Sequence, residues 1–417
     1  PNLKQFQAKK AAVGESDDQS IARMLPSVSA TASTSGDWLH NKKAGGAVTP
    51  NGLPDFRGPQ VNQAYSSHTF SVNITQPVFH WDHWVQLSQA DNKIAQAEAD
   101  YQAELQKLML KTTEAYFNVL SAQDNLKFTT AEKEAIARQL DQAKQRFEVG
   151  IIPITDVHEA QAGFDQVVAN EIEAINNIDN QKETLGEIIG NSNVELNGLG
   201  EQLPLLKPEP SKIETWSTAA EQNNFSIVAA VNQVEFARKS IDIQRSGHLP
   251  QLDIVASYGV SDVNNSFGFR GDNQSVGLRL NVPLFEGGAV NSKTRQASYE
   301  YEAAKESLNA TKRTVNREVK NAFRGVMTNI GRVEALKAAV ASSESALAAT
   351  EEGFAVGTRT MVEVLNEQRN LFKAKRDFAR ARYDYLIQSI KLKQSSSNLS
   401  QNDLEQINRL LTLADQK

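Results

Sequence analysis

The tetrapeptide Phe147-Glu148-Val149-Gly150 returns 207 residues later as Phe354-Ala355-Val356-Gly357. Two further matches have almost the same spacing, and they pair Gln76-Pro77-Val78-Phe79 with Val282-Pro283-Leu284-Phe285 and Ala115-Tyr116-Phe117-Asn118-Val119 with Ala322-Phe323-Arg324-Gly325-Val326. A sequence that matches itself at one spacing encodes one structural unit twice. The pattern therefore predicts two structural repeats, residues 1–205 and 206–417.

A fourth match, Leu25-Pro26-Ser27-Val28 with Leu249-Pro250-Gln251-Leu252, has a spacing of 224 residues. The loop between the first two strand segments is accordingly longer than its counterpart in the second repeat. This alignment places Pro1 opposite Phe225. We therefore expect a counterpart of residues 211–224 upstream of Pro1.

Four segments alternate apolar and polar side chains with a period of two residues, which predicts strands with one apolar face. They are residues 26–39, 66–79, 250–262 and 273–285. Each has about the length that a tilted strand needs to cross a bilayer. Two amphipathic hairpins lying on a soluble core are the alternative. Tryptophans near the strand ends favour the bilayer, because aromatic belts mark membrane boundaries; they are Trp38, Trp81 and Trp84.

Four strands cannot close a barrel, and an open strand edge is not tolerated in lipid. Several chains must therefore share one barrel. Two chains would supply eight strands around a lumen filled by side chains, and three would supply twelve around a passage. We favour a homotrimer, in which a twelve-stranded β-barrel with four strands per chain continues into a long α-helical coiled-coil tunnel.

No glycine or proline interrupts residues 84–147, which predicts a helix of roughly 95 Å. Its apolar positions follow a three-four spacing that predicts left-handed supercoiling against neighbouring helices. They are Leu105, Leu108, Thr112, Ala115, Val119, Ala122 and Leu126 in the first repeat, and Ala322, Val326, Ile330, Val333, Leu336, Val340 and Leu347 in the second. The long helices are therefore expected to pack side by side.

Gly150 and Gly357 mark tip turns after the long helices, and shorter helices over 155–189 and 359–394 return from them. The tunnel helices are thus predicted over 84–189 and 286–394. Helices over 1–24 and 213–247 have the complementary length, so we expect them to stack end to end on the shorter helices.

The composition excludes several classes of function. The chain has no cysteine, which excludes a disulfide framework, a thiolate metal site and a cysteine nucleophile. Its net charge of -6 provides no basic surface for nucleic acid. No run of about 18 apolar residues predicts a transmembrane helix. No convergent nucleophile, base and metal cluster indicates an enzyme. A soluble periplasmic coiled-coil scaffold is the remaining alternative, and it leaves the apolar strand faces unexplained.

His80 and His83 have the spacing of a metal-binding pair, but no third or fourth ligand is suggested nearby. His158 lies close to Asp156, and a solvated helix face explains it better than an acid/base pair. We therefore predict no catalytic residue, no metal site and no cofactor. No Gly-rich phosphate loop occurs, so energy must come from a partner.

The chain resembles the TolC family of trimeric outer-membrane efflux and type I secretion channel-tunnel proteins over nearly its whole length. The most specific motifs are Arg146-Phe147-Glu148-Val149-Gly150 with Ile154-Thr155-Asp156-Val157, and Val356-Gly357-Thr358-Arg359-Thr360-Met361-Val362-Glu363-Val364-Leu365. The resemblance implies equatorial belt segments over 191–216 and 397–413. It also implies an exit duct in the outer membrane of a Gram-negative bacterium, with most of the chain in the periplasm.

The family resemblance further implies partners and a gate. The partners would be a periplasmic adaptor of the membrane fusion type, an inner-membrane transporter of the ABC or RND type, and the lipid bilayer. Arg359 and the Thr155-Asp156 pair fall on polar link positions of the gate, and Glu363 falls on an acidic ring. Phe354 stands where a linking tyrosine is usual, and Asn366 stands where a second ring acid is usual. We expect a more weakly latched and less acidic entrance, for cargo that includes drugs, small molecules or unfolded polypeptides.

Overall fold

The computed structural model describes residues 2–41, 47–48, 54–55, 61–191, 195–200, 203–263 and 270–412. The chain divides into two compact units. A helical unit contains Pro1–Lys9, Ala97–Ala230 and Ser307–Lys417, and a strand-bearing unit contains Lys10–Gln96 and Val231–Glu306. Each unit draws on both halves of the sequence, so the compact units do not coincide with the two predicted repeats. The division into repeats stays a prediction.

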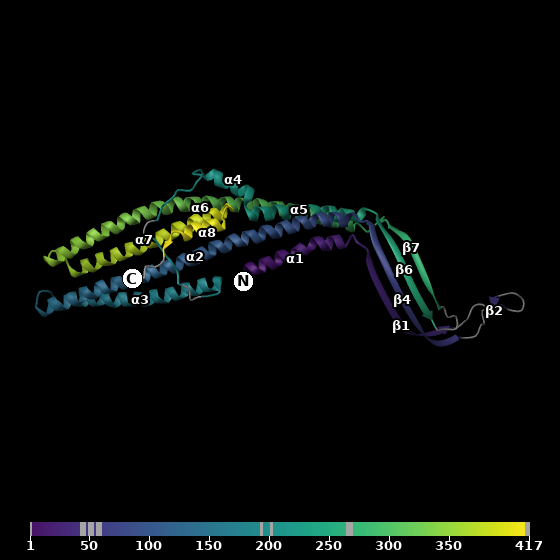
Figure 1. The fold of residues 1–417 in the computed structure, drawn as a ribbon, viewed down its shortest axis with the longest axis horizontal. Coiled ribbons are helices and arrows are strands. Elements are labelled where there is room, and N and C mark those ends of the chain that lie inside the picture. The colour runs from purple at the N-terminus through teal and green to yellow at the C-terminus, as the bar shows by residue number, and fades with distance from the viewer. Residues whose placement is uncertain are drawn as a thin grey trace. The chain divides into compact units, whose positions relative to one another are not determined.

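The strand-bearing unit contains a four-stranded antiparallel sheet with the order β1-β4-β6-β7 (Figure 1). Its strands are β1 (Ser27–Asn41), β4 (Val61–Phe79), β6 (Gln251–Val263) and β7 (Arg270–Asn281). A separate short pair joins β2 (Ala47–Val48) to β3 (Pro54–Asp55). The strand predicted over 273–285 ends at Asn281, because Pro283 has no N–H to donate to a ladder.

The strand register places the apolar residues of all four strands on one face. Directly paired residues share a face, and one row across the sheet consists of Val28, Ile74, Ala256 and Val276. The opposite face is polar. Hydroxyl groups bond across it between Ser33 and Thr69 at 2.6 Å and between Ser257 and Ser275 at 2.7 Å. The predicted alternation is therefore present in the sheet.

The apolar face of the sheet is not covered within one chain. On β7, the side chain of Val276 is 81% exposed and that of Leu278 is 73% exposed. Among the described residues, the long strands β1 and β7 each pair on one side only. One chain thus leaves an apolar face and two strand edges for other surfaces to cover.

The long helices begin and end close to their predicted positions. They are α2 (Trp81–Glu148), α3 (Ile154–Ile189), α6 (Ala289–Ala355) and α7 (Met361–Ser395). The other helical elements are α1 (Asn2–Ala22), α4 (Ile213–Asn223), α5 (Phe225–Arg245), the short 3-10 helix η1 (Ser246–His248) and α8 (Gln401–Asn408). None of the helices in the described part of the chain is both long and apolar enough to cross a membrane.

The helix predicted over 213–247 is two helices, because Asn224 interrupts it. The Asn224 side chain accepts a hydrogen bond from the Ser226 N–H at 2.9 Å, as an N-cap residue does, and α5 starts there. Its Nδ2 also donates to the Ser395 carbonyl oxygen at 2.9 Å. The break thus ties the start of α5 to the end of α7.

The predicted belt segments 191–216 and 397–413 include residues 192–194, 201–202 and 413, which lie outside the described residues. In the part that is described, β5 (Gly198–Leu199) pairs with β8 (Leu411–Thr412) in antiparallel fashion. This pairing brings one predicted belt segment against the other. The equatorial role of the two segments stays a prediction.

The core of the helical unit follows the predicted seams. Ala322, Val326, Ile330 and Val333 of α6 are buried in one cluster with Phe117 of α2 and Tyr383 of α7. The Phe117 and Tyr383 rings stack with their centroids 5.7 Å apart. Small and aliphatic side chains allow close helix packing, and the outer seam positions Leu336, Val340 and Leu347 are only half-buried in one chain.

A buried ion pair connects α2 to α7, and it predicts an effect on stability. Glu132 is 3% exposed, and Arg376 Nη1 donates to its Oε2 at 2.7 Å. Arg376→Ala is expected to destabilise the protomer by about 3–5 kcal/mol, because the remaining carboxylate is buried without its partner. Urea unfolding followed by circular dichroism measures the loss. Lys305→Ala, at the exposed pair of Lys305 and Glu302, is the control and is expected to change stability by about 0–1 kcal/mol. Equal effects of the two variants would contradict the prediction.

Candidate functional site

Two tight turns in the helical unit end the long helices, and glycine makes both possible. Gly150 has a φ of 76° and Gly357 a φ of 79°, a left-handed conformation that favours glycine. The N–H of Gly150 donates to the Phe147 carbonyl oxygen at 2.9 Å, and that of Gly357 donates to the Phe354 carbonyl oxygen at 3.1 Å. The repeated tetrapeptide is therefore the C-terminus of a helix. The two turns lie at the same end of the helical unit (Figure 1).

An apolar cluster holds the two turns together. It consists of buried side chains from α2, α3 and α7 with four half-buried side chains around them, and it contains Ile136, Leu140, Ala143, Ala160, Val167, Met361 and Leu365 with Ile152, Val157, Phe164 and Phe354. The Phe354 ring also lies 5.0 Å from the guanidinium carbon of Arg146. Phe354 is thus a packing residue that joins the end of α6 to the end of α2.

A network of three polar residues begins α7. Thr360 is the N-cap, and it forms a capping box with Glu363: the Glu363 N–H donates to Thr360 Oγ1 at 3.3 Å, and the Thr360 N–H donates to Glu363 Oε2 at 2.7 Å. Arg359 Nη1 donates to Glu363 Oε1 at 2.7 Å. Arg359 was predicted to begin the returning helix, and instead it stands just before the N-cap. The Glu363 carboxylate therefore bonds to both residues that precede the helix.

Gly353 is a residue of this site that sequence reasoning missed. Its carbonyl oxygen accepts hydrogen bonds from the Thr358 N–H at 2.8 Å and the Arg359 N–H at 3.2 Å. A Cβ atom at Gly353 would lie 2.6 Å from Arg359 Cγ. Only glycine therefore lets Arg359 lie against the last turn of α6. The sequence offered one signal: Gly353 lies four residues before Gly357, inside a predicted helix, and glycine is rare in helix interiors.

The Glu363 carboxyl has a pKa below its ordinary value of 4.5. The main cause is the hydrogen bond from the Thr360 backbone N–H, followed by the one from the Arg359 guanidinium. In an acidic ring, repulsion between three Glu363 carboxylates would raise their proton affinity. Within one chain the pKa of Glu363 is lowered instead, because the Thr360 and Arg359 donors stabilise the ionised carboxylate.

The remaining predicted gate residues lie on the same two turns. Thr155 is exposed in the first turn of α3, and Asp156 is half-buried beside it. Asn366 is exposed on α7, one turn after Glu363. Among the described residues of one chain, no hydrogen bond or ion pair joins Arg359 to Asp156. The fold thus brings Arg359 to Glu363 and does not join it to Asp156 within one chain, and the predicted link to Asp156 stays a prediction.

Sequence comparison assigns this combination of sheet and helices to a family. The outer membrane efflux protein family matches residues 1–191 and 216–398. Outer membrane protein TolC of Escherichia coli (strain K12) is 36% identical over 99% of this chain and 82% of that protein. The chain belongs to the outer membrane efflux protein family. A second relative in this family, the alkaline protease secretion protein AprF of Pseudomonas aeruginosa, is 28% identical over 82% of this chain and 72% of that protein.

Solved structures of outer membrane efflux proteins agree with the fold. The outer membrane protein VceC from Vibrio cholerae superposes with a TM-score of 0.79, at 18% identity, over 95% of this chain and 92% of that chain. This likeness confirms the predicted fold of four antiparallel strands with long helices, and the family implies the trimeric barrel. The family assignment excludes the alternative interpretation, a soluble periplasmic coiled-coil scaffold.

Membership in the outer membrane efflux protein family confirms the predicted function. The protein is an outer-membrane channel for efflux or type I secretion in a Gram-negative bacterium, and it is not an enzyme. Channels of the TolC family work in tripartite systems.

Proposed function

We propose that three copies of this chain form an exit duct whose gate lies at the α2–α3 and α6–α7 turns. The observation that carries this proposal is the position of Arg359, which the close approach to Gly353 and the bond to Glu363 hold at the start of α7. A guanidinium has five N–H donors in a rigid fork, and the bond to Glu363 uses one of its nitrogens. The same side chain can therefore also bond a second carboxylate.

The second carboxylate in this proposal is Asp156 of a neighbouring copy. Asp156 lies in the first turn of α3, and Arg359 stands just before the N-cap of α7. The apolar cluster next to both turns puts the two residues at one end of the unit. A guanidinium bonds a carboxylate in two-pronged fashion, which fixes orientation as well as distance. Three such links would hold the trimer in one closed state, and their release would open it. Phe354 has no hydroxyl group to add to the latch.

Glu363 would line the constriction that this gate closes. Three-fold symmetry would bring three ionised carboxylates around one passage, which attracts cations. Asn366 would add no charge to a second ring. Thr155 would stand beside the link, with its hydroxyl group available to the neighbouring copy.

The partner proteins in this proposal are a periplasmic adaptor of the membrane fusion type and an inner-membrane transporter of the ABC or RND type. No Gly-rich phosphate loop occurs in the chain, so nucleotide hydrolysis or ion flow must be coupled by a partner. Drugs, small molecules and unfolded polypeptides are the proposed cargo. The lipid bilayer is the partner of the apolar sheet face.

Glu363→Gln is expected to lower the cation selectivity of the channel, because it removes one charge from each copy at the constriction. The lowered pKa of Glu363 adds a pH dependence. A depressed pKa keeps the carboxylates ionised as the pH falls to about 4.5, so wild-type selectivity should persist there and disappear only at lower pH. Reversal potentials of single channels under a salt gradient measure both effects.

Glu351→Gln, at an exposed acid on the last turns of α6, is the matched control for Glu363→Gln and should leave selectivity unchanged. Asn366→Asp adds the missing charge and should make the channel more sensitive to block by multivalent cations. If Glu363→Gln retains wild-type reversal potentials, the selectivity site lies elsewhere. Failure of this test alone leaves the outer-membrane assignment untouched.

A further inference from the structure

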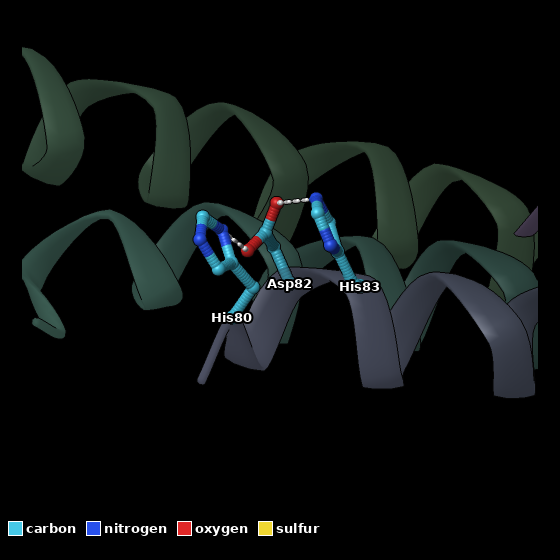
Figure 2. Close-up of side chains that lie close together, drawn as sticks. All are labelled: His80, Asp82 and His83. Carbon is cyan, nitrogen blue, oxygen red and sulfur yellow. Dashed lines mark ion pairs between the residues drawn. The ribbon is translucent and has the colours of Figure 1, made fainter. Parts of the chain in front are cut away.

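A cluster of two histidines and one aspartate lies where β4 ends and α2 begins. β4 ends at Phe79 and α2 begins at Trp81, so His80 stands between the strand and the helix. Asp82 and His83 lie in the first turn of α2, close to His80. His80 Nδ1 is 4.0 Å from Asp82 Oδ1, and His83 Nε2 is 3.7 Å from Asp82 Oδ2. Figure 2 shows the Asp82 carboxylate joined by a dashed line to each of the two imidazole rings. All three groups lie within the strand-bearing unit.

A second carboxylate orients the first histidine of this cluster. Asp253 of β6 bonds His80 Nε2 through Oδ1 at 2.9 Å. With Nε2 occupied, the Nδ1 atom is the one that faces Asp82. Histidines that bind metals commonly donate their other ring N–H to a carboxylate, which fixes both the tautomer and the ring orientation. Asp253 therefore stands in the position of an outer carboxylate for a metal-binding histidine.

The two ring nitrogens of His83 have different surroundings. Its Nδ1 is buried and has no hydrogen-bond partner in the part of the chain that the structure describes. The separation of 3.7 Å between its Nε2 and Asp82 is too long for a hydrogen bond. Most buried side-chain nitrogens in folded proteins are bonded. Nε2 is therefore the ring nitrogen of His83 that faces the Asp82 carboxylate, and Nδ1 stays without a partner even when Nε2 binds a further group.

We propose that His80, Asp82 and His83 bind one divalent transition-metal cation of the Zn²⁺ class. The ligand atoms are His80 Nδ1, an Asp82 carboxylate oxygen and His83 Nε2, and Asp253 supports His80 from outside. Two imidazoles and one carboxylate are a donor set that suits Zn²⁺ and its first-row neighbours and disfavours Mg²⁺ and Ca²⁺. Three protein ligands leave a coordination position for water.

To bind the metal, the three ligand atoms must move closer together and one ring must rotate. Ligand atoms about 2.0–2.2 Å from a tetrahedral Zn²⁺ are about 3.3 Å from one another. The three ligand atoms now lie within 4.8 Å of one another, so the widest separation must shorten by about 1.5 Å. The two imidazole rings now stack with centroids 4.7 Å apart and planes 17° apart. Since the lone pairs of parallel rings do not converge, the His83 ring must turn out of this stack.

The sequence prediction of no metal site rested on the lack of a third ligand near His80 and His83. The structure supplies the carboxylate of Asp82 as that ligand and places Asp253 behind His80 from 173 residues further along the chain. A bound cation would join the first turn of α2 to the end of β4 and, through Asp253, to β6. It would thus stabilise the junction between sheet and helix.

The test uses the tag-free trimer in detergent, stripped of metal with EDTA and dialysed. Titration calorimetry with Zn²⁺ should give one ion per protomer, and Co²⁺ should give the visible absorption bands of a protein-bound ion. His83→Gln removes a ligand and should weaken Zn²⁺ binding at least about tenfold. Asp253→Asn keeps all three ligands and should weaken it about 10- to 100-fold, as loss of an outer carboxylate does.

His68→Gln and His158→Gln are the matched controls for nonspecific binding by histidine. His68 lies on β4 and bonds Thr34 Oγ1 at 2.8 Å, and His158 is exposed on α3. Both controls should bind Zn²⁺ as the wild type does. If His83→Gln does not assemble, Asp253→Asn decides the question. Wild-type affinity in an assembled His83→Gln or Asp253→Asn trimer, or the absence of Zn²⁺ binding by the wild type, would overturn the proposal.

Discussion

Replacing Val276 or Leu278 with arginine is expected to abolish trimer assembly in the outer membrane. Both side chains lie on the apolar face of the sheet and are 81% and 73% exposed in one chain, so lipid is their natural environment. An arginine near the middle of a bilayer costs roughly 2–4 kcal/mol in a membrane strand, and each trimer would carry three. Because β7 is an edge strand, the same change also weakens the surface that joins one copy to the next.

The assembly test compares heat-modifiable trimers in outer-membrane fractions by gel electrophoresis. Asn273→Arg is the matched control, because Asn273 lies on the same strand with the opposite parity and pairs with Gly259 on the polar face. That variant should assemble as the wild type does. Normal trimers in both Val276→Arg and Leu278→Arg would show that the apolar face of β7 does not contact lipid.

Arg359→Ser is expected to raise single-channel conductance severalfold and to admit large antibiotics such as vancomycin into cells. Helix seams are apolar and nearly continuous, so packing alone gives little preference for one closed state, whereas a polar latch does. Arg359 is the cation held at the start of α7 by Gly353 and Glu363. Since Phe354 adds no hydroxyl bond, Arg359 should carry a large share of the closure.

Planar bilayer recordings with matched trimer content measure this effect. Arg359→Lys should fall between Arg359→Ser and the wild type, because an ammonium group cannot bond a carboxylate in two-pronged fashion. Asp156→Asn separates the two possible partners of Arg359. A rise in conductance with Asp156→Asn but not with Glu363→Gln would assign the latch to a link between copies. Wild-type conductance in Arg359→Ser would mean that closure depends on other contacts.

The sequence by itself determined the elements of the fold. Alternation over residues 66–79 and 250–262 determines which side chains share a sheet face, because successive residues in a strand point to opposite sides. The absence of glycine and proline over 84–147 predicted a long helix, and its three-four seam predicted packing against neighbouring helices. Gly150 and Gly357 predicted the turns, because glycine tolerates a positive φ. These signals are local, since each depends on residues within a few positions of one another.

Only the tertiary structure decided how the candidate sites are assembled. The contact between the start of α5 and the end of α7 depends on the bond from Asn224 to the Ser395 carbonyl oxygen, and the orientation of His80 depends on Asp253 in another strand. The position of Arg359 depends on the missing Cβ of Gly353 and on which oxygen of Glu363 faces it. Such contacts join residues that are distant in sequence or depend on the direction of a single side chain. Sequence periodicity does not predict these contacts, because they form only when the packed helices and strands bring the atoms within bonding distance.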